Sequence, residues 1–197
     1  MTGQRPVTRG ADHGGAPEGL DDLLDLYRSD KATAMYDEVV TEREHALQAA
    51  ALAEAEGADA ATVAAALLHD VGRLTIAWDS AEGAFVAADR AHDSVGERLL
   101  ARWFGPEVTA PVGMHVAAKR YLCAVEPAYA DALSPVSVRS LAVQGGPMSP
   151  DEVTAFEARD GWEAGVQLRR WDDRAKSTEP ATKTIDDYVG LLTALAR

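Results

Sequence analysis

The chain has 197 residues, of which 47% are hydrophobic and only 6% aromatic, and its formal net charge is -13. This length is enough for one domain with a substantial core, and alanine as the main apolar residue favours closely packed helices. The negative charge argues against a nucleic acid partner and against an anionic membrane surface. No stretch reaches the roughly 18 apolar residues of a membrane-spanning helix. Cys123 is the only cysteine, so no intrachain disulfide can form, and we expect a cytoplasmic protein.

The N-terminal part of the sequence changes character near residue 20. Residues 1–19 are rich in Gly, Pro, Arg and Asp, which predicts a disordered leader, and residues 20–197 are expected to form a single domain. Residues 20–28 place Leu and Tyr side chains at helical spacing and are predicted to form a short amphipathic helix. A connector over residues 29–40 follows.

The next predicted helix begins with a capping-box pattern. Thr41 occupies the N-cap position and Glu44 follows three residues later. The helix carries His45 in its first turns and is expected to end near Gly57.

A following helix is predicted from its cap at Asp59. It contains an apolar run that is followed by the adjacent pair His69 and Asp70, and we expect the helix to end at Gly72. Residues 74–90 are less regular, and the sequence predicts a loop or lid with about one helical turn.

Two longer helices are predicted after that loop. The first carries His92, runs to Phe104 and stops at Gly105 as the residue after its C-cap, with a proline behind it. The second carries His115 and Lys119, which are four residues apart and therefore share one helix face.

The last third of the chain is also predicted to be helical. Residues 127–140 are expected to contain one short helix, and residues 149–152 form a second capping-box pattern with a proline at the first helical position. The helical pattern after it breaks near Gly161 and resumes towards Asp172, and Thr184 caps a final helix. Because no repeat and no strand alternation is present, the predicted fold is all-α.

The histidines are the strongest functional signal. The sequence contains five: His13 in the leader, and four that are spaced 24, 23 and 23 residues apart, namely His45, His69, His92 and His115. A single histidine is more often a surface or hydrogen-bonded residue than a ligand. These four each lie beside small apolar residues, and their spacing fits one inward-pointing ligand on each helix of a bundle. His69 and the adjacent Asp70 can hold one metal together, or Asp70 can bridge two metals.

One more carboxylate late in the chain is expected to complete the site. Asp172 and Asp173 are equally good candidates at this level. Imidazole and carboxylate ligands without thiolate suit iron, manganese, zinc or nickel. Four neutral histidines and two aspartates carry a charge of -2, so two metals at +2 or +3 leave the centre positive, and Lys119 adds to that charge. The residues therefore predict a dinuclear metal site for a small phosphate or phosphonate, without separating hydrolysis from oxygen chemistry.

The order of these residues resembles that of a known superfamily. The pattern His45, His69-Asp70 and Asp172, with His92 and His115 between them, is similar to the dinuclear branch of the HD-domain superfamily, which contains phosphohydrolases and oxygenases. A closer resemblance is to the HD oxygenases that cleave phosphonates such as 2-amino-1-hydroxyethylphosphonate. The similar stretches are 44–48, 68–72, 115–122 (HVAAKRYL), 144–148 (QGGPM) and 170–172.

This resemblance implies a helical HD-domain bundle around two iron ions in a mixed-valent Fe(II)/Fe(III) state, with O2 as co-substrate. One iron is expected to be held by His45, His69, Asp70 and Asp172, and the other by Asp70, His92 and His115. Asp70 and Lys119 are the expected catalytic residues. The implied reaction adds oxygen at carbon 1 and breaks the C–P bond of 2-amino-1-hydroxyethylphosphonate or an N-methylated relative, giving phosphate and an amino acid such as glycine or a betaine.

The resemblance also implies substrate contacts. Lys119 and Ser137 match positions that hold the phosphonate, and Glu38 matches the acid that receives the amine. Where the family has an iron-gating tyrosine this chain has Met35, with Tyr36 next to it, so the gate is expected to differ or to shift by one residue.

A second departure is Arg73, which stands where the family has a histidine close to the metals. It is expected to bind the substrate anion more strongly, to indicate a different substrate, or to complement a helix C-terminus.

Two other functions remain open at the level of sequence. A dinuclear HD phosphohydrolase acting on a nucleotide or small phosphate ester would need the same ligands, with a metal-bound hydroxide as nucleophile. A non-catalytic HD module that binds a small ligand is the other alternative, and the complete ligand set argues against it. The sequence leaves the oligomeric state open.

Overall fold

The structure is a computed structural model that describes residues 17–35, 39–75 and 82–197, with the helical backbone alone for residues 82–90. Within these ranges every regular element is a helix, apart from one isolated antiparallel bridge between Met35 and Thr41. The all-α prediction is therefore confirmed. In chain order the elements are α1 (Leu20–Arg28), η1 (Asp30–Thr33), α2 (Glu42–Ala55), α3 (Ala60–Leu68), α4 (Val71–Thr75), α5 (Glu82–Leu100), α6 (Pro106–Val125), α7 (Pro127–Asp131), α8 (Pro135–Val143), α9 (Pro150–Glu157), α10 (Trp162–Arg174), η2 (Ile185–Tyr188) and α11 (Val189–Leu195).

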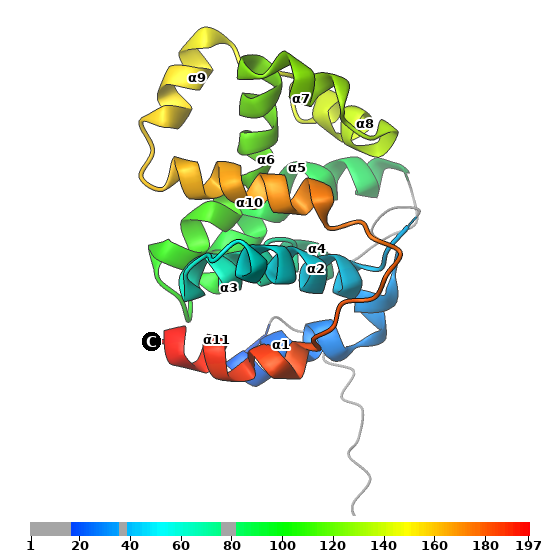
Figure 1. Cartoon of the computed structure of the whole chain (residues 1–197), viewed down its shortest axis with the longest axis vertical. Helices are drawn as coiled ribbons and strands as arrows, with labels where there is room; N and C mark the ends of the chain where they lie inside the picture. Colours follow the sequence, from blue (N-terminus) through cyan, green and yellow to red (C-terminus); the bar gives the residue numbers. More distant parts are fainter. Residues whose placement is uncertain (1–16, 36–38, 76–81) are drawn as a thin grey trace, which may run out of the picture.

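The helices are stacked in layers around α6 (Figure 1). Helices α1 and α11 lie together at one end, α2 and α3 form the next layer, and α10 lies between them and the group of α7, α8 and α9 at the other end. Helix α6 packs against α10, α5 and α3. Because α6 carries His115, this packing brings that side chain towards the helices that hold the other predicted ligands.

Alanine allows the central helices to approach closely, as the composition predicted. Ala49, Ala50 and Ala53 of α2 are fully buried, and so are the three alanines at 64–66 in α3. Small side chains at a helix contact shorten the distance between the helix axes. The large apolar residues fill the space on either side of this contact, with Leu67 and Leu68 fully buried.

One prediction about the central motif is wrong. His69 and Asp70 do not lie inside one helix, because α3 ends at Leu68 and α4 begins at Val71. The backbone forms a turn at His69 and Asp70, and Nδ1 of His69 lies 2.9 Å from the carbonyl oxygen of Ala66.

The predicted loop over 74–90 is wrong for most of its length. Helix α4 continues to Thr75 and α5 begins at Glu82, while residues 76–81 lie outside the described ranges. The alanine-rich sequence of the N-terminal half of α5 supports a helix in spite of Gly83.

The predicted role of Gly105 is also wrong. Helix α5 ends at Leu100, and Gly105 is the N-cap of α6, with an extended backbone at φ -82° and ψ 174°. Pro106 explains this, because a proline disfavours the helical conformation of the residue before it and is well suited to the first helical position.

The predicted caps are largely confirmed. Thr41 accepts a hydrogen bond from the amide of Glu44, but the carboxylate of Glu44 accepts from the amide of Ala181 and does not complete the capping box. Ser149 and Glu152 form the full capping box. Residues 127–140 hold parts of two helices, α7 and α8, where one was predicted.

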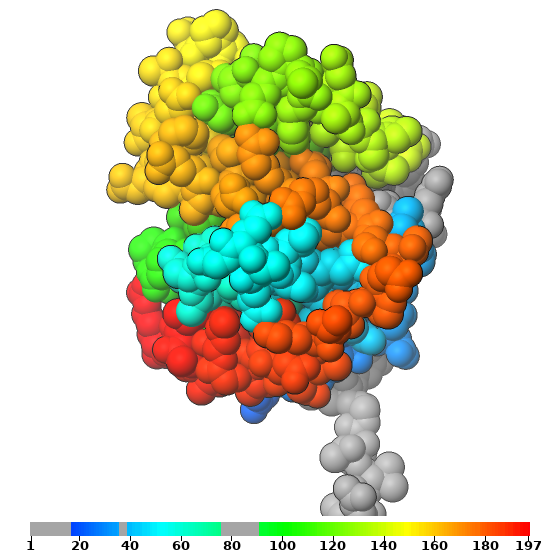
Figure 2. All heavy atoms as spheres, in the orientation of Figure 1, coloured from blue at the N-terminus to red at the C-terminus, as the bar shows by residue number. Residues whose placement is uncertain are grey.

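The segment after α10 closes over α2. The side-chain amide of Gln48 donates to the carbonyl oxygens of Ser177 and Glu179 and accepts from the amide of Ser177. Figure 2 shows this segment, in orange and red, running across the surface beside the cyan and blue helices. It returns the chain to α11, which packs against α3. The predicted leader, including His13, lies almost entirely outside the described residues.

Candidate metal centre

Five of the side chains expected to bind metal converge from four parts of the fold. They form two groups, His45 with His69 and Asp70, and Asp70 with His92 and His115, and within each group the potential ligand atoms all lie within 4.8 Å of one another. Helix α2 supplies His45, the junction of α3 and α4 supplies His69 and Asp70, and α5 and α6 supply His92 and His115.

Asp70 faces both groups with a different oxygen. Its Oδ2 lies 3.5 Å from Nε2 of His69 and 3.9 Å from Nε2 of His45. Its Oδ1 lies 3.2 Å from Nε2 of His92 and 3.5 Å from Nε2 of His115. The carboxylate therefore stands between the two groups with the geometry of a bridging ligand.

The structure separates the two late aspartates. Asp172, on α10, is 1% exposed, and its Oδ1 lies 3.3 Å from Nε2 of His45, so it joins the first group. Asp173 points elsewhere: Oδ1 accepts from Arg169 and Oδ2 accepts from the Tyr129 hydroxyl. The two candidates therefore differ in direction, and only Asp172 faces the histidines.

The imidazole rings are oriented by backbone carbonyls. Nδ1 lies 2.9 Å from the Ala175 oxygen in His45, 2.9 Å from the Ala66 oxygen in His69, and 2.7 Å from the Val112 oxygen in His115. A carbonyl only accepts, so each Nδ1 carries the proton and each Nε2 presents a lone pair to the centre.

The Nε2 atoms of each group face one another at short range. Nε2 of His45 lies 3.1 Å from Nε2 of His69, and Nε2 of His92 lies 3.0 Å from that of His115. In His45 and His69, which both contact a carbonyl oxygen through Nδ1, two bare lone pairs at this distance repel unless a cation lies beside both. Adjacent ligands of an octahedral ion, each at about 2.1 Å, are separated by about 3.0 Å. The donor set therefore fits a metal in each group.

Burial and charge place the two carboxylates and His69 in the forms that bind metal. Burial would raise the pKa of the Asp70 carboxyl, but His69, His115 and His92 outweigh it and hold that pKa well below its usual value. Burial opposes ionisation of Asp172 as well, and Arg169 and His45 hold its pKa well below the ordinary value. Burial lowers the pKa of His69 to about 4. Near neutral pH both carboxylates are ionised and His69 is neutral.

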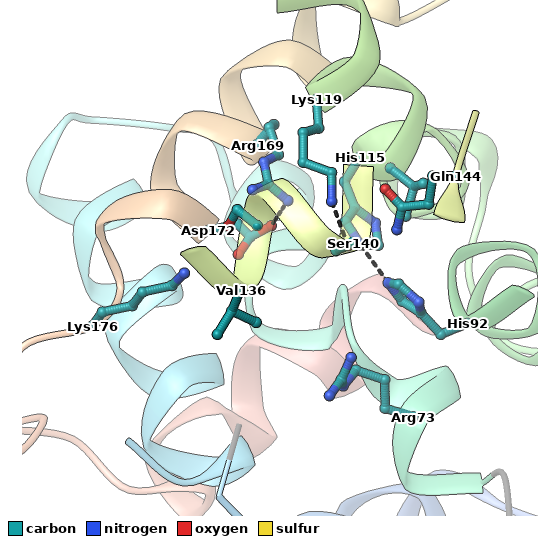
Figure 3. A pocket seen from close by; sticks show the side chains of 12 residues that line it. Arg73, His92, His115, Lys119, Val136, Ser140, Gln144, Arg169, Asp172 and Lys176 are labelled. Carbon is teal, nitrogen blue, oxygen red and sulfur yellow. Dashed lines mark hydrogen bonds and ion pairs between the residues drawn. The ribbon is translucent and has the colours of Figure 1, made fainter. Parts of the chain in front are cut away.

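An inner cavity of about 40 Å³ opens beside these ligands. In Figure 3 its labelled side chains point inward from α6, α10, α4 and α8. Its lining consists of Arg73, His92, His115, Val116, Lys119, Val136, Ser137, Ser140, Gln144, Arg169, Asp172 and Lys176. Four of these residues are Arg or Lys and one is Asp, so the wall beyond the histidines is predominantly cationic.

Three of the predicted substrate contacts lie in this wall. Lys119 is 2% exposed and its ammonium donates to Oγ of Ser140 at 2.6 Å. Ser137 lines the cavity near the start of α8. Arg73 lines it from α4 and donates to the Glu42 carboxylate at 2.9 Å, so its charge is anchored from inside the protein as well as facing the cavity.

Sequence reasoning missed Arg169, Lys176 and Ser140. Arg169 is 4% exposed and donates to Oδ2 of Asp172 at 2.6 Å. The signal available was spacing, since Arg169 precedes Asp172 by three residues on a helix and so shares its face. Two predicted residues, Tyr36 and Glu38, lie outside the described residues. Met35, next to them, is 54% exposed.

Comparison with known proteins agrees with this arrangement. Residues 43–133 match the HD domain family. The chain is 44% identical over 171 residues to a hydroxymethylphosphonate dioxygenase of Gimesia maris, covering 87% of this chain and 85% of that protein.

A second relative is the glycine-betaine-forming [1-hydroxy-2-(trimethylamino)ethyl]phosphonate dioxygenase of Leisingera caerulea, at 40% identity over 150 residues, or 74% of each chain. An uncharacterised protein of Acanthamoeba polyphaga mimivirus is 30% identical over 176 residues, covering 89% of this chain and 80% of that one. In the parts of the chain that the structure describes, no helix is both long and apolar enough to cross a membrane. With its ligand clusters, its HD-domain match and relatives at this identity, the chain belongs to the phosphonate-cleaving HD oxygenase family.

Proposed function

We propose that this protein is a diiron dioxygenase that uses O2 to cleave the C–P bond of a small 1-hydroxyalkylphosphonate, releasing phosphate and a carboxylic acid. One observation carries the proposal: two groups of potential metal ligands share Asp70, and they lie beside a cavity whose wall is rich in buried cations. The ligand groups alone would suit a hydrolase equally well. The relatives, which are dioxygenases acting on hydroxyphosphonates by name, support the oxygenase.

The metal is proposed to be iron at both positions, in a mixed-valent Fe(II)/Fe(III) state. His45, His69, Asp70 and Asp172 would hold one ion, and Asp70, His92 and His115 the other. Nitrogen and oxygen donors without thiolate suit iron among other metals. Bound iron would supply the redox chemistry towards O2, which none of the side chains in the inner cavity can provide.

The residues of the chain would position the anion and exclude water. A phosphonate dianion in the inner cavity would meet Lys119 and Arg73, with Ser137 and Ser140 as hydroxyl donors. Charge-assisted hydrogen bonds of this kind are about twice as strong as neutral ones. Deep burial of Lys119 and Arg169 means that their charges act at low dielectric, where attraction to a dianion is strongest.

The reaction balances without a reductant. Hydroxymethylphosphonate and one O2 contain the atoms of formic acid and phosphoric acid, and 2-amino-1-hydroxyethylphosphonate and one O2 contain those of glycine and phosphoric acid. In each case the carbon that carried the hydroxyl is oxidised to a carboxyl group, the C–P bond breaks, and O2 is the oxidant. The implied products are therefore phosphate and one acid per O2.

The substrate is proposed to be small. Two relatives differ in what their names say they act on, one substrate having no amine and the other a trimethylammonium group. The inner cavity of about 40 Å³ favours a compact molecule. Candidates are hydroxymethylphosphonate, 2-amino-1-hydroxyethylphosphonate and N-methylated relatives of the latter.

The test is a comparison of substrates with and without air. Iron-loaded protein should release phosphate from at least one of these phosphonates in air and release none under anaerobic conditions. A panel of nucleotides and phosphate esters should give no phosphate under either condition. Phosphate release from an ester without O2 would overturn the proposal and identify a phosphohydrolase.

A further inference from the structure

A second cavity adjoins the metal site and has no role in the function proposed above. It has a volume of about 430 Å³ and lies between α7, the start of α8 and the C-terminal half of α10. Its lining residues are Tyr129, Ala132, Leu133, Ser134, Ser137, Arg170, Asp173, Arg174 and Lys176. We call it the outer cavity. Ser137 and Lys176 line both cavities, so the two meet at these side chains.

The outer cavity is cationic in a strongly acidic protein. Arg170, Arg174 and Lys176 line it, and among the residues that the structure describes Asp173 is its only acidic lining residue. The Asp173 carboxylate already accepts hydrogen bonds from the Arg169 guanidinium and the Tyr129 hydroxyl. With a net charge of -13 on the whole chain, a cavity lined mainly by cationic side chains is the opposite of what composition predicts.

Arg169 forms the partition between the two cavities. Its Nη1 donates to Asp172, which lines the inner cavity, and its Nε donates to Asp173 at 3.1 Å and to the Tyr129 hydroxyl at 3.1 Å in the outer one. The cationic walls of the two cavities are therefore connected through one buried side chain. Fields of one sign in a cleft with low-dielectric walls raise the local concentration of the opposite ion.

We infer that the outer cavity is the vestibule through which an organophosphonate anion reaches the metal site and inorganic phosphate leaves it. The identity of the anion rests on the proposed function, whereas selectivity of the vestibule for anions rests on its own lining. Arg170 is paired with Glu126, and Arg174 is paired with Glu56. Neither glutamate lines a cavity, so an anion in the outer cavity would meet the arginine of each pair and not the glutamate.

The first test measures the local field without using enzyme activity. Ala132 is exposed and lines the outer cavity, so Ala132→Cys places a reactive thiol there, and the wild-type protein reports any background from buried Cys123. Labelling rates are compared for two methanethiosulfonates of similar size, one bearing a sulfonate and one a trimethylammonium group. The sulfonate reagent should react at least threefold faster after correction for its rate with free cysteine.

A matched pair of double variants identifies the source of that preference. Arg170→Gln with Arg174→Gln should lower it, with Lys176 as the remaining cation of the lining. The control is Arg28→Gln with Lys183→Gln, which removes the same charge. These two side chains have similar exposure and are also ion-paired, but they line neither cavity. The control should leave the preference for the sulfonate reagent unchanged. Equal rates for the two reagents, or equal effects of the two double variants, would overturn the anion-selective vestibule.

The second test asks whether the anion uses this route. A bulky maleimide on Ala132→Cys should lower kcat/KM for a hydroxyphosphonate at least fivefold and leave the iron content unchanged. The control is the same label on Ala101→Cys, an exposed position that lines neither cavity, and it should have no effect. Unchanged kcat/KM in a protein that does cleave phosphonates would overturn the route and leave the proposed function standing. If no phosphonate is cleaved, the proposed function fails, and the labelling rates still decide whether the outer cavity selects anions.

Discussion

At the scale of single residues, the centre depends most on the two oxygens of Asp70. Each oxygen faces one group of histidines, so Asp70→Ala should remove both metals. Asp172 contacts only the group of His45, and Asp172→Ala should mainly lower occupancy of that one. Metal analysis of purified variants gives the stoichiometry per chain. Asp173→Ala is the matched control and should retain both metals; loss of metal from it but not from Asp172→Ala would reverse the assignment of the two aspartates.

Lys119 is the residue on which phosphonate binding should depend most. It is buried, shares a helix face with His115, and its ammonium is held by Ser140 at the cavity wall. Lys119→Ala should raise KM for the phosphonate at least tenfold, because truncating one partner of a desolvated charge pair costs roughly 2–5 kcal/mol. Steady-state kinetics on protein of equal iron content makes the measurement. An unchanged KM would show that the ammonium does not contact substrate.

Glu38 is predicted to recognise an amine if the natural substrate carries one. Glu38→Gln should lower kcat/KM for 2-amino-1-hydroxyethylphosphonate at least tenfold, since a substrate ammonium would lose its charged partner. Hydroxymethylphosphonate, which has no amine, serves as the matched control substrate and should be affected much less. Equal losses on both substrates would show that Glu38 is not the amine receptor.

At the scale of elements, the glycine after the His-Asp pair has a packing role. A Cβ on Gly72 would lie 2.0 Å from the carbonyl oxygen of His92, so α4 and α5 approach each other here by backbone contact. Gly72→Ala should therefore destabilise the fold by about 1–3 kcal/mol and displace His92, lowering metal content. Thermal unfolding and metal analysis measure both effects. Gly190→Ala on α11, where a Cβ meets nothing within 4 Å, is the control and should not lower the melting temperature.

The elements show which local signals in the sequence were sufficient. Caps with a side-chain acceptor, such as Thr41, Asp59 and Ser149, predicted helix starts correctly, because the cap is a local interaction. The end of α3 at Leu68 was missed, because the turn at His69 and Asp70 has no local signal in the sequence before Gly72. Gly105 was assigned to the wrong helix, because glycine suits both a helix end and an N-cap, and only the following proline distinguishes them.

At the scale of the whole molecule, the spacing of four histidines predicted a shared centre, and the packing of α6 against α3, α5 and α10 brings them together. What sequence could not predict is direction. Asp172 and Asp173 are adjacent in the chain, but only Asp172 points at the histidine cluster, while Asp173 faces the outer cavity. The two cavities and the Arg169 partition arise from helices that are far apart in sequence, and no local pattern reports them.

The central claim is that O2 is the reagent that breaks the C–P bond, and the most direct measurement is the ratio of phosphate formed to O2 consumed. Iron-loaded protein is mixed with hydroxymethylphosphonate or 2-amino-1-hydroxyethylphosphonate in a closed cell with an oxygen electrode, and phosphate is determined in the same sample. The account predicts one phosphate per O2, with no added reductant, and formate or glycine in equal amount. Phosphate formed without O2 consumption, or O2 consumed without phosphate, would contradict it.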